Sequence, residues 1–206
     1  GLFYPNTTIS YGSRKQELVD KKKDPDCIFD KIRKALYKLP LWMMPQMNVQ
    51  IPTIKRKGKK KSIEFNKREY DNHLLIVNPQ NGSVIRGESG DSMGRGGRSS
   101  IYFVDEFAFV EHQERVDGAI SENSMCRIYL STYSAPNNLF YRKVNGGEYP
   151  VFRFRWQDDP RKNDAWYAEK KRTLEPIILA REIDCDPHAS IEGLAIEASH
   201  IRCAIN

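Results

Sequence analysis

Residues 101–106 constrain the fold of this chain most, because an apolar run passes directly into two adjacent carboxylates. They read Ile-Tyr-Phe-Val-Asp-Glu. Four consecutive apolar residues suit a strand that is buried on both faces, as in a parallel sheet. Open α/β sheets bind their ligands at the carboxyl ends of the strands, and this strand would present Asp105 and Glu106 there. The hexapeptide therefore predicts an α/β fold with an acidic edge.

Two interpretations of the acidic pair stay open from these residues alone. In nucleotide hydrolases of the P-loop class, an acid at this place holds Mg²⁺ and a second group positions the attacking water. Strand ends also carry Asp or Glu simply because the chain is leaving the core, and short motifs often match by chance. Only the surrounding sequence can decide between phosphate chemistry and an ordinary strand end.

Length and composition indicate a soluble globular protein. The 206 residues suffice for one domain with a sizeable core, or for one domain with a small appendage. Hydrophobic residues make up 39% and charged residues 29%, which predicts a packed core and a polar surface. No stretch is long and apolar enough for a membrane span, and we expect no membrane partner. The four cysteines are widely spaced, which favours reduced thiols in a cytosolic setting.

The charge is moderately basic, at +6, which favours polyanionic partners without establishing one. One strong run of positive charge occurs, at residues 55–61. It offers no apolar face and no interleaved aromatic residues, so a solvated mobile loop is one interpretation and a loop that contacts DNA phosphates is the other. The residues concerned are Lys55, Arg56, Lys57, Lys59, Lys60 and Lys61.

Hydrophobic periodicity and turn residues predict an alternation of strands and helices. We expect strands over residues 7–11, 73–77, 83–87, 101–104, 126–130 and 149–156, and helices over residues 14–22, 26–39, 107–120, 137–144 and 163–174. An Asn-Gly pair between the second and third of these strands predicts a β-hairpin. Strand, helix and strand over residues 101–130 fit a parallel crossover, which would bring Asp105 and Ser131 to the same edge of the sheet.

A glycine-rich segment, residues 90–98, precedes the acidic strand and contains Arg95 and Arg98. Because it does not follow a strand and open a helix, it is not a phosphate cradle of the usual kind. We expect a flexible loop. It either has no further role or delivers one of the two arginines to a phosphate group.

Several stretches, taken in order, resemble the ATPase domain of the large terminase subunit of tailed phages, the motor that packs viral DNA. The resemblance covers nearly the whole chain, and the order and spacing of the stretches make it specific. They are residues 11–21, 24–26, 31–33 and 39–40 with Phe29, residues 94–96 and 104–109, Ser131-Thr132 with residues 137–140, and Trp156 with residues 159–160, 181–182 and 190–193.

The resemblance implies a P-loop NTPase-like (ASCE) fold, with a mostly parallel central sheet flanked by helices, a β-hairpin and a small C-terminal helical lid. Residues 1–156 would be part of the ATPase core, and residues 157–206 the lid or linker. Asp105 resembles the acid that binds Mg²⁺, and Glu106 the residue that polarises the water attacking the γ-phosphate of ATP. Ser131-Thr132 resemble the coupling motif. Arg95, with Arg98 as second choice, resembles an arginine finger that acts on a neighbouring subunit's nucleotide.

The same resemblance implies partners and a setting. ATP would be the substrate and Mg²⁺ the cofactor, and double-stranded DNA would be translocated into a procapsid. The longer protein would meet a small terminase subunit and a portal protein, and would form a ring in the cytoplasm of a bacterial host.

The sequence departs from the family pattern in two ways. It contains no Gly-x-x-x-x-Gly-Lys-Ser/Thr element, since residues 58–62 lack the first glycine and the spacing. It also contains no counterpart of the nuclease that follows the family's ATPase. We therefore expect a piece of a larger protein that by itself binds ATP poorly and cuts no DNA. A helicase-like ATPase fragment and a non-catalytic DNA-binding or structural module remain the alternatives.

Overall fold

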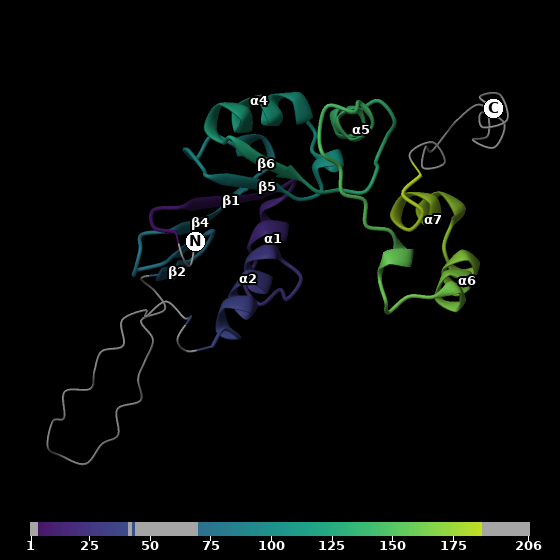
Figure 1. Ribbon diagram of the computed structural model, residues 1–206, viewed down its shortest axis with the longest axis horizontal. Coiled ribbons are helices and arrows are strands. Elements are labelled where there is room, and N and C mark those ends of the chain that lie inside the picture. Colours follow the sequence, from purple (N-terminus) through teal and green to yellow (C-terminus); the bar gives the residue numbers. More distant parts are fainter. Residues whose placement is uncertain (1–3, 41–42, 44–69, 187–206) are drawn as a thin grey trace, which may run out of the picture. The chain divides into compact units, whose positions relative to one another are not determined.

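A computed structural model describes residues 4–40, 43 and 70–186 of the chain (Figure 1). The chain divides into two compact units, one of Gly1–Asp105 with Arg115–Ile128 and the other of Glu106–Glu114 with Tyr129–Asn206. These units describe packing, whereas the predicted division at residue 156 concerns function and stays a prediction. The basic residues at 55–61 and the residues near 190–193 lie outside the described part.

The first unit is built on a sheet of six strands in the order β2-β3-β4-β1-β5-β6. Its strands are β1 (Thr8–Ser13), β2 (Asp71–Asn72), β3 (Leu75–Val77), β4 (Val84–Ser89), β5 (Ile101–Val104) and β6 (Cys126–Tyr129). Strand β1 pairs in parallel with β4 and with β5, while β3 pairs antiparallel with β2 and with β4. The predicted α/β class, the hairpin and the buried acidic strand are therefore confirmed.

Helices cover both faces of this sheet. Figure 1 shows α1 (Gln16–Val19) and α2 (Ile28–Tyr37) on one face and α4 (Gln113–Asn123) on the other. Val19 and Phe29 are fully buried on the first face, where they pack with Ile76 of β3. The second face carries the fully buried Met93, Tyr102, Val116 and Ile120. Because both faces are covered at β5, all four residues of this strand are apolar.

Strand β1 extends further than its sequence predicts. Gly12 and Ser13, which lie beyond the predicted strand over residues 7–11, pair with Glu88 and Ser89 of β4 as the last residues of the strand. Gly12 is needed there, because a Cβ atom at this position would overlap the sulfur of Met93. The following helix α1 is correspondingly short, and the prediction of a helix over residues 14–22 is wrong at both ends.

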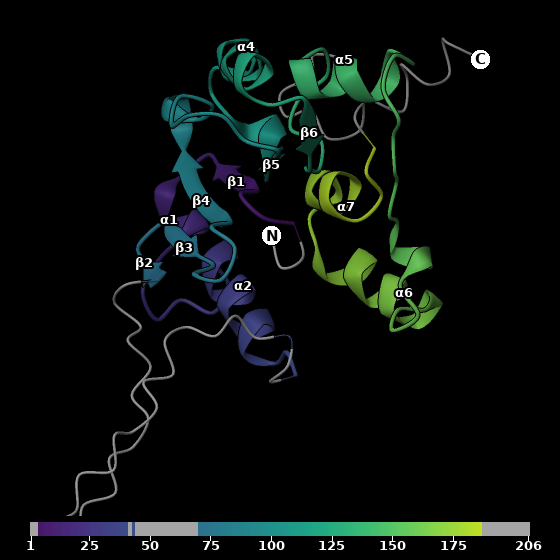
Figure 2. The ribbon, with the colours of Figure 1, turned by 60° about the vertical axis from the view of Figure 1, so that its left-hand side comes forward.

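The second unit contains a 3-10 turn at Phe107–Phe109 and the helices α5 (Leu139–Asn145), α6 (Asp164–Thr173) and α7 (Pro176–Glu182). Figure 2 shows α6 and α7 as neighbours along the chain. Asparagine side chains cap two of these helices: Asn138 accepts a hydrogen bond from Tyr141 N, and Asn163 accepts one from Trp166 N. The predicted helix over residues 107–120 is confirmed only from Gln113, where α4 begins, and is wrong before it, because residues 107–109 form the separate 3-10 turn.

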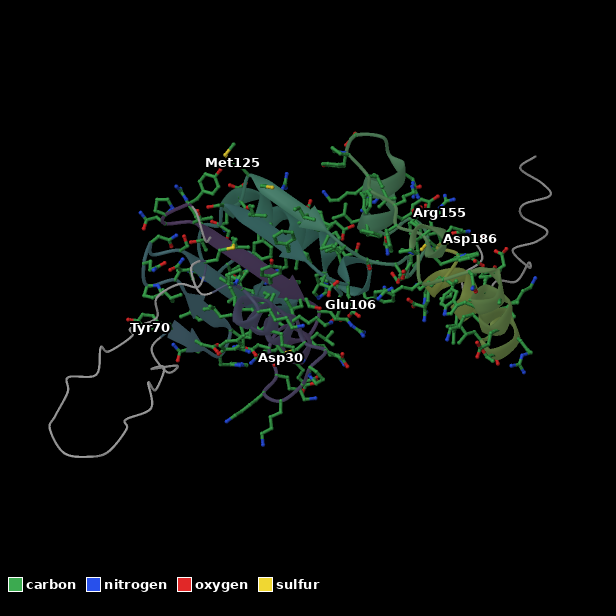
Figure 3. All side chains as sticks on the ribbon, turned by 60° about the horizontal axis from the view of Figure 1, so that its bottom comes forward. Asp30, Tyr70, Glu106, Met125, Arg155 and Asp186 are labelled. Atoms are coloured by element: carbon green, nitrogen blue, oxygen red, sulfur yellow. The ribbon has the colours of Figure 1, made fainter. Side chains whose placement is uncertain are left out.

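The predicted strand over residues 149–156 is also wrong. The segment is not helical and its large apolar side chains are exposed, with Phe152 at 87% and Phe154 at 59%. It ends at Arg155, which is labelled in Figure 3 and precedes the 3-10 turn Trp156–Asp158. Alternation of aromatic and charged residues favours a strand locally, but a strand forms only against a partner, and no described strand pairs with this segment. No helix in the described residues is long and apolar enough to cross a membrane.

Candidate functional site

Asp105 begins where β5 ends, at the carboxyl edge of the parallel strands. Its N–H donates to the carbonyl of Gly12 at 2.8 Å, which continues the β1–β5 ladder by one residue. Ser13 is therefore the neighbour of Asp105 across the ladder. The Ser13 side chain is fully buried, and its Oγ has no hydrogen-bond partner in the described residues. Asp105 itself is half-buried. The sheet thus places a carboxylate and an unsatisfied hydroxyl side by side at the edge where such folds bind ligands.

Glu106 has a left-handed backbone conformation, which it shares with five other non-glycine residues in the described part of the chain. Its φ of 53° and ψ of 36° lie in the left-handed region, and it caps the 3-10 turn Phe107–Phe109 (Figure 3). Placing a residue other than glycine in this region costs about 1–3 kcal/mol of conformational free energy, which the surrounding structure must offset. Part of that support comes from the next residue, because Phe107 N donates to Leu130 O at 3.1 Å. Backbone strain of this kind concentrates at functional sites.

The coupling residues proposed from the sequence lie against this turn within the second unit. Ser131 Oγ accepts a hydrogen bond from Ala108 N at 3.2 Å. Thr132 Oγ1 donates to Glu182 Oε2 of α7 at 3.3 Å. The two hydroxyls therefore connect the turn that follows Glu106 with a helix more than forty residues further along the chain.

Sequence reasoning missed three residues that hold the same turn. The carbonyl of Ala108 accepts from Gln113 Nε2 at 2.9 Å and from Ser134 Oγ at 2.5 Å. Asn138 Nδ2 donates to Ser134 Oγ at 2.9 Å. Both hydrogen-bonding groups of the Ala108 peptide are thus satisfied by side chains. Of the three, only Asn138 carried a sequence signal, through the N-cap preference of asparagine and its place among the stretches that resemble the terminase family.

Arg95 and Arg98 lie in the first unit and are exposed. Neither guanidinium has a hydrogen-bond or ion-pair partner within the described part of the chain. The flexibility of the loop around them stays a prediction, but its backbone is hydrogen-bonded at Gly94, whose N–H and carbonyl contact the side chains of Glu88 and Asn123. The loop therefore holds the backbone next to Arg95 in place while leaving the arginine side chains in solvent.

The donors at the edge suit a magnesium ion that is shared with a nucleotide. No group of three His, Cys, Asp or Glu side chains gathers in the described residues, so they offer no all-protein metal cage. Mg²⁺ commonly takes one or two carboxylates, with phosphate oxygens and waters completing its octahedron. Asp105 can supply one such carboxylate, and the remaining ligands would have to come from the nucleotide and water.

The sheet and the helices on its two faces define a mixed α/β fold with an acidic edge. No protein-family model matches the sequence, and no curated protein is similar to it. Solved structures are similar. The ATPase domain of the large terminase of Thermus phage P74-26 superimposes with a TM-score of 0.55 and 16% identity, over 89% of this chain and 77% of that one.

A second solved structure, the large terminase of a thermophilic bacteriophage in complex with ADP, has a TM-score of 0.55 and 11% identity. The match covers 88% of this chain and 40% of that one. At these identities the similarity is one of fold. The chain therefore has the fold of phage large-terminase ATPase domains, as its sequence motifs predict.

Proposed function

We propose that this chain is part of a phage large terminase subunit, which drives viral DNA into the procapsid by Mg²⁺-dependent ATP hydrolysis. The observation that carries this proposal is the conformation of Glu106, a strained acid directly after Asp105 at the end of a buried strand. The fold shared with large-terminase ATPase domains supports it, and so does the ADP bound to one of those proteins.

The two acids take different roles in this proposal. Asp105 holds Mg²⁺ directly or through water, and the bound ion neutralises charge on the phosphates. Glu106 accepts a hydrogen bond from the attacking water and aligns it with the γ-phosphate. The left-handed backbone of Glu106 sets the direction of its side chain, and the hydrogen bond from Phe107 N to Leu130 O helps to keep it.

Ser131 and Thr132 act as the coupling residues. A hydroxyl can gain or lose one hydrogen bond when a phosphate leaves. Any displacement of the turn at Ala108 would reach Ser131 directly, and Thr132 would pass it to α7 through Glu182. This path gives residues 157–206 their proposed role as a lid that moves with the nucleotide state.

Arg95 is proposed as the arginine finger, with Arg98 as the second choice. An exposed guanidinium with no partner in the described residues can reach a neighbouring subunit's nucleotide in a ring and stabilise charge on the transferring phosphoryl group. Mixing an Arg95→Ala protein with a Glu106→Gln protein should restore part of the activity, because each supplies the part the other lacks. No recovery at any mixing ratio would contradict action between subunits.

DNA is the proposed polymer partner, with the small terminase subunit and portal protein as partners of the longer protein in the host cytoplasm. Residues 55–61 are proposed to contact phosphates. DNA binding should then weaken steeply with salt and depend little on sequence. Deleting residues 55–61 should reduce retention of double-stranded DNA at low salt, and unchanged retention would place the DNA surface elsewhere.

The proposal is tested by ATP hydrolysis in the full-length protein, including its phosphate-binding loop, with and without Mg²⁺. Asp105→Asn should raise the Mg²⁺ concentration needed for half-maximal rate by about tenfold or more, because it removes a charged ligand. Absence of Mg²⁺-dependent hydrolysis in the wild-type protein would contradict the proposal and support a non-catalytic module instead.

A further inference from the structure

Glu88 is a buried carboxylate to which the proposed hydrolysis site assigns no role. It lies on β4 and is 8% exposed. Its Oε2 accepts a hydrogen bond from Gly94 N at 2.7 Å and another from the hydroxyl of Tyr102 at 2.9 Å. Its Oε1 has no hydrogen-bond partner in the described residues. One oxygen of this acid therefore joins β4 to the glycine-rich loop at Gly94, whose N–H also lies 3.2 Å from the Tyr102 hydroxyl oxygen.

Gly94 is held on its other side as well. Asn123 Nδ2 of α4 donates to its carbonyl at 2.6 Å. The residue has a φ of +79°, and a Cβ atom here would lie 2.6 Å from the backbone nitrogen of Ile120, so only glycine fits. The peptide that precedes Arg95 is thus fixed between β4 and α4.

The backbone on the far side of Arg95 is also restrained. The Arg86 guanidinium donates to the carbonyl of Gly96. A Cβ atom on Gly96 would overlap Oε1 of Glu88, so the loop passes directly over this carboxylate. Arg95 N donates to Ser92 O at 3.1 Å. The side chain of Arg95 is therefore exposed, while the backbone of both neighbouring residues, Gly94 and Gly96, is hydrogen-bonded.

We propose that Glu88 is a positioning residue for Arg95. A buried charge is costly unless it is hydrogen-bonded, and here its hydrogen bonds go to the loop amide and to a tyrosine hydroxyl that supports the same oxygen. The carboxylate fixes Gly94, and Gly94 fixes the point from which the Arg95 side chain leaves the loop. The effect of Glu88 on catalysis rests on the proposed function, in which Arg95 contacts a nucleotide. The effect of Glu88 on the position of the loop does not depend on that function.

The hold on the loop can be measured in this chain without any nucleotide. Glu88→Met keeps the side-chain volume and removes the shorter of the two acceptors of the Gly94 N–H, leaving the Tyr102 hydroxyl oxygen at 3.2 Å. Amide hydrogen exchange at Gly94 should therefore accelerate by about tenfold, the value of one charge-assisted hydrogen bond. Glu88→Gln keeps an acceptor oxygen and should stay close to wild type. The amides of β5 serve as the internal reference.

Unchanged exchange at Gly94 in Glu88→Met, with β5 intact, would overturn the proposal. Should Glu88→Met fail to fold, Tyr102→Phe provides the second variant, because it removes one donor to Oε2 and leaves the acid in place. Tyr102→Phe should accelerate amide exchange at Gly94 by a smaller factor than Glu88→Met does. No acceleration would again contradict the proposal.

Hydrolysis by the full-length protein tests the consequence for Arg95. Glu88→Met and Arg95→Ala should lower kcat by similar factors with little change in KM, and the double variant should be no slower than the slower single variant. Glu88→Gln should retain most of the rate. Multiplicative losses would contradict positioning. If Arg95→Ala leaves kcat unchanged, the proposed finger role fails, and the exchange measurement still decides whether Glu88 holds the loop.

Discussion

Replacing Arg33 by leucine should lower the free energy of unfolding by about 3 kcal/mol at pH 7, because it leaves the buried carboxylate of Asp20 without its ion-pair partner. Arg33 donates to both oxygens of Asp20, at 2.8 and 2.9 Å, and through Nε to Asp71 Oδ1 at 2.7 Å. The side chains of Asp20 and Arg33 are 3% and 18% exposed. Together these contacts join the end of α1, helix α2 and strand β2.

The magnitude follows from what remains after the substitution. Removing one partner of a buried ion pair costs about 3–5 kcal/mol. Asp20 Oδ2 still accepts from Leu74 N at 2.8 Å and lies 3.5 Å from His73 Nδ1, so the loss should fall at the lower end. Lys34→Leu is the matched control on the same helix. Its ion pair with Asp30 is largely exposed and should contribute less than about 0.5 kcal/mol.

Urea unfolding at pH 7 and at pH 4 gives the test. Burial raises the pKa of Asp20, but the hydrogen bonds and charge of Arg33 and the Leu74 amide outweigh burial, so its pKa lies below the ordinary value. A depressed pKa in the folded state gives stability that is present above the unfolded value, about 3.9, and is lost as the pH falls through the folded one.

The variant should respond differently to acid. Without Arg33, burial raises the pKa of Asp20, so protonation at pH 4 relieves the penalty and the gap between variant and wild type narrows. A loss below about 1 kcal/mol at pH 7, or a gap that widens as the pH is lowered, would refute the reasoning.

Three further pairs of substitutions test local features by thermal and urea unfolding. Gly87→Ala should cost about 1–3 kcal/mol, because its Cβ would lie under 3 Å from three core side chains, whereas Gly118→Ala in α4 meets no atom within 4 Å and should be neutral or stabilising. Equal effects of the two would contradict the packing. Asn138→Ala should cost about 1 kcal/mol through loss of the α5 cap, and Asn138→Asp should retain it. Ser131→Ala should cost about 1 kcal/mol by leaving the Ala108 amide unpaired, with a smaller effect for Thr132→Val, whose hydrogen bond is exposed.

Local sequence pattern sufficed for the elements whose residues carry their own signal. The apolar run before Asp105 predicts β5, and the Asn-Gly turn predicts the hairpin, because burial and turn geometry depend on neighbouring residues. The alternation over residues 149–156 carries the same local signal but predicts a strand that the structure does not contain. A strand also needs a partner, and sequence pattern does not reveal whether one is present.

The sequence predicts the two acidic residues of the candidate site but not the residues that hold them in position. Adjacent carboxylates at a strand end are visible in the sequence, whereas the left-handed backbone of Glu106 is not. The contacts that hold the site come from distant residues, such as Ser131 on Ala108 and Glu88 on Gly94. Such hydrogen bonds depend on the tertiary fold, and in the sequence Glu88 is an ordinary charged residue directly after the predicted strand over residues 83–87.

The central claim is that Glu106 activates water while Asp105 serves the metal ion. Its most direct test is a single-turnover measurement of ATP hydrolysis by full-length Glu106→Gln, alongside Mg²⁺-ATP binding. The account predicts a rate at least about a hundredfold below wild type with binding within about twofold, because glutamine keeps the size of the side chain and removes its negative charge. Wild-type hydrolysis by this variant would contradict the account.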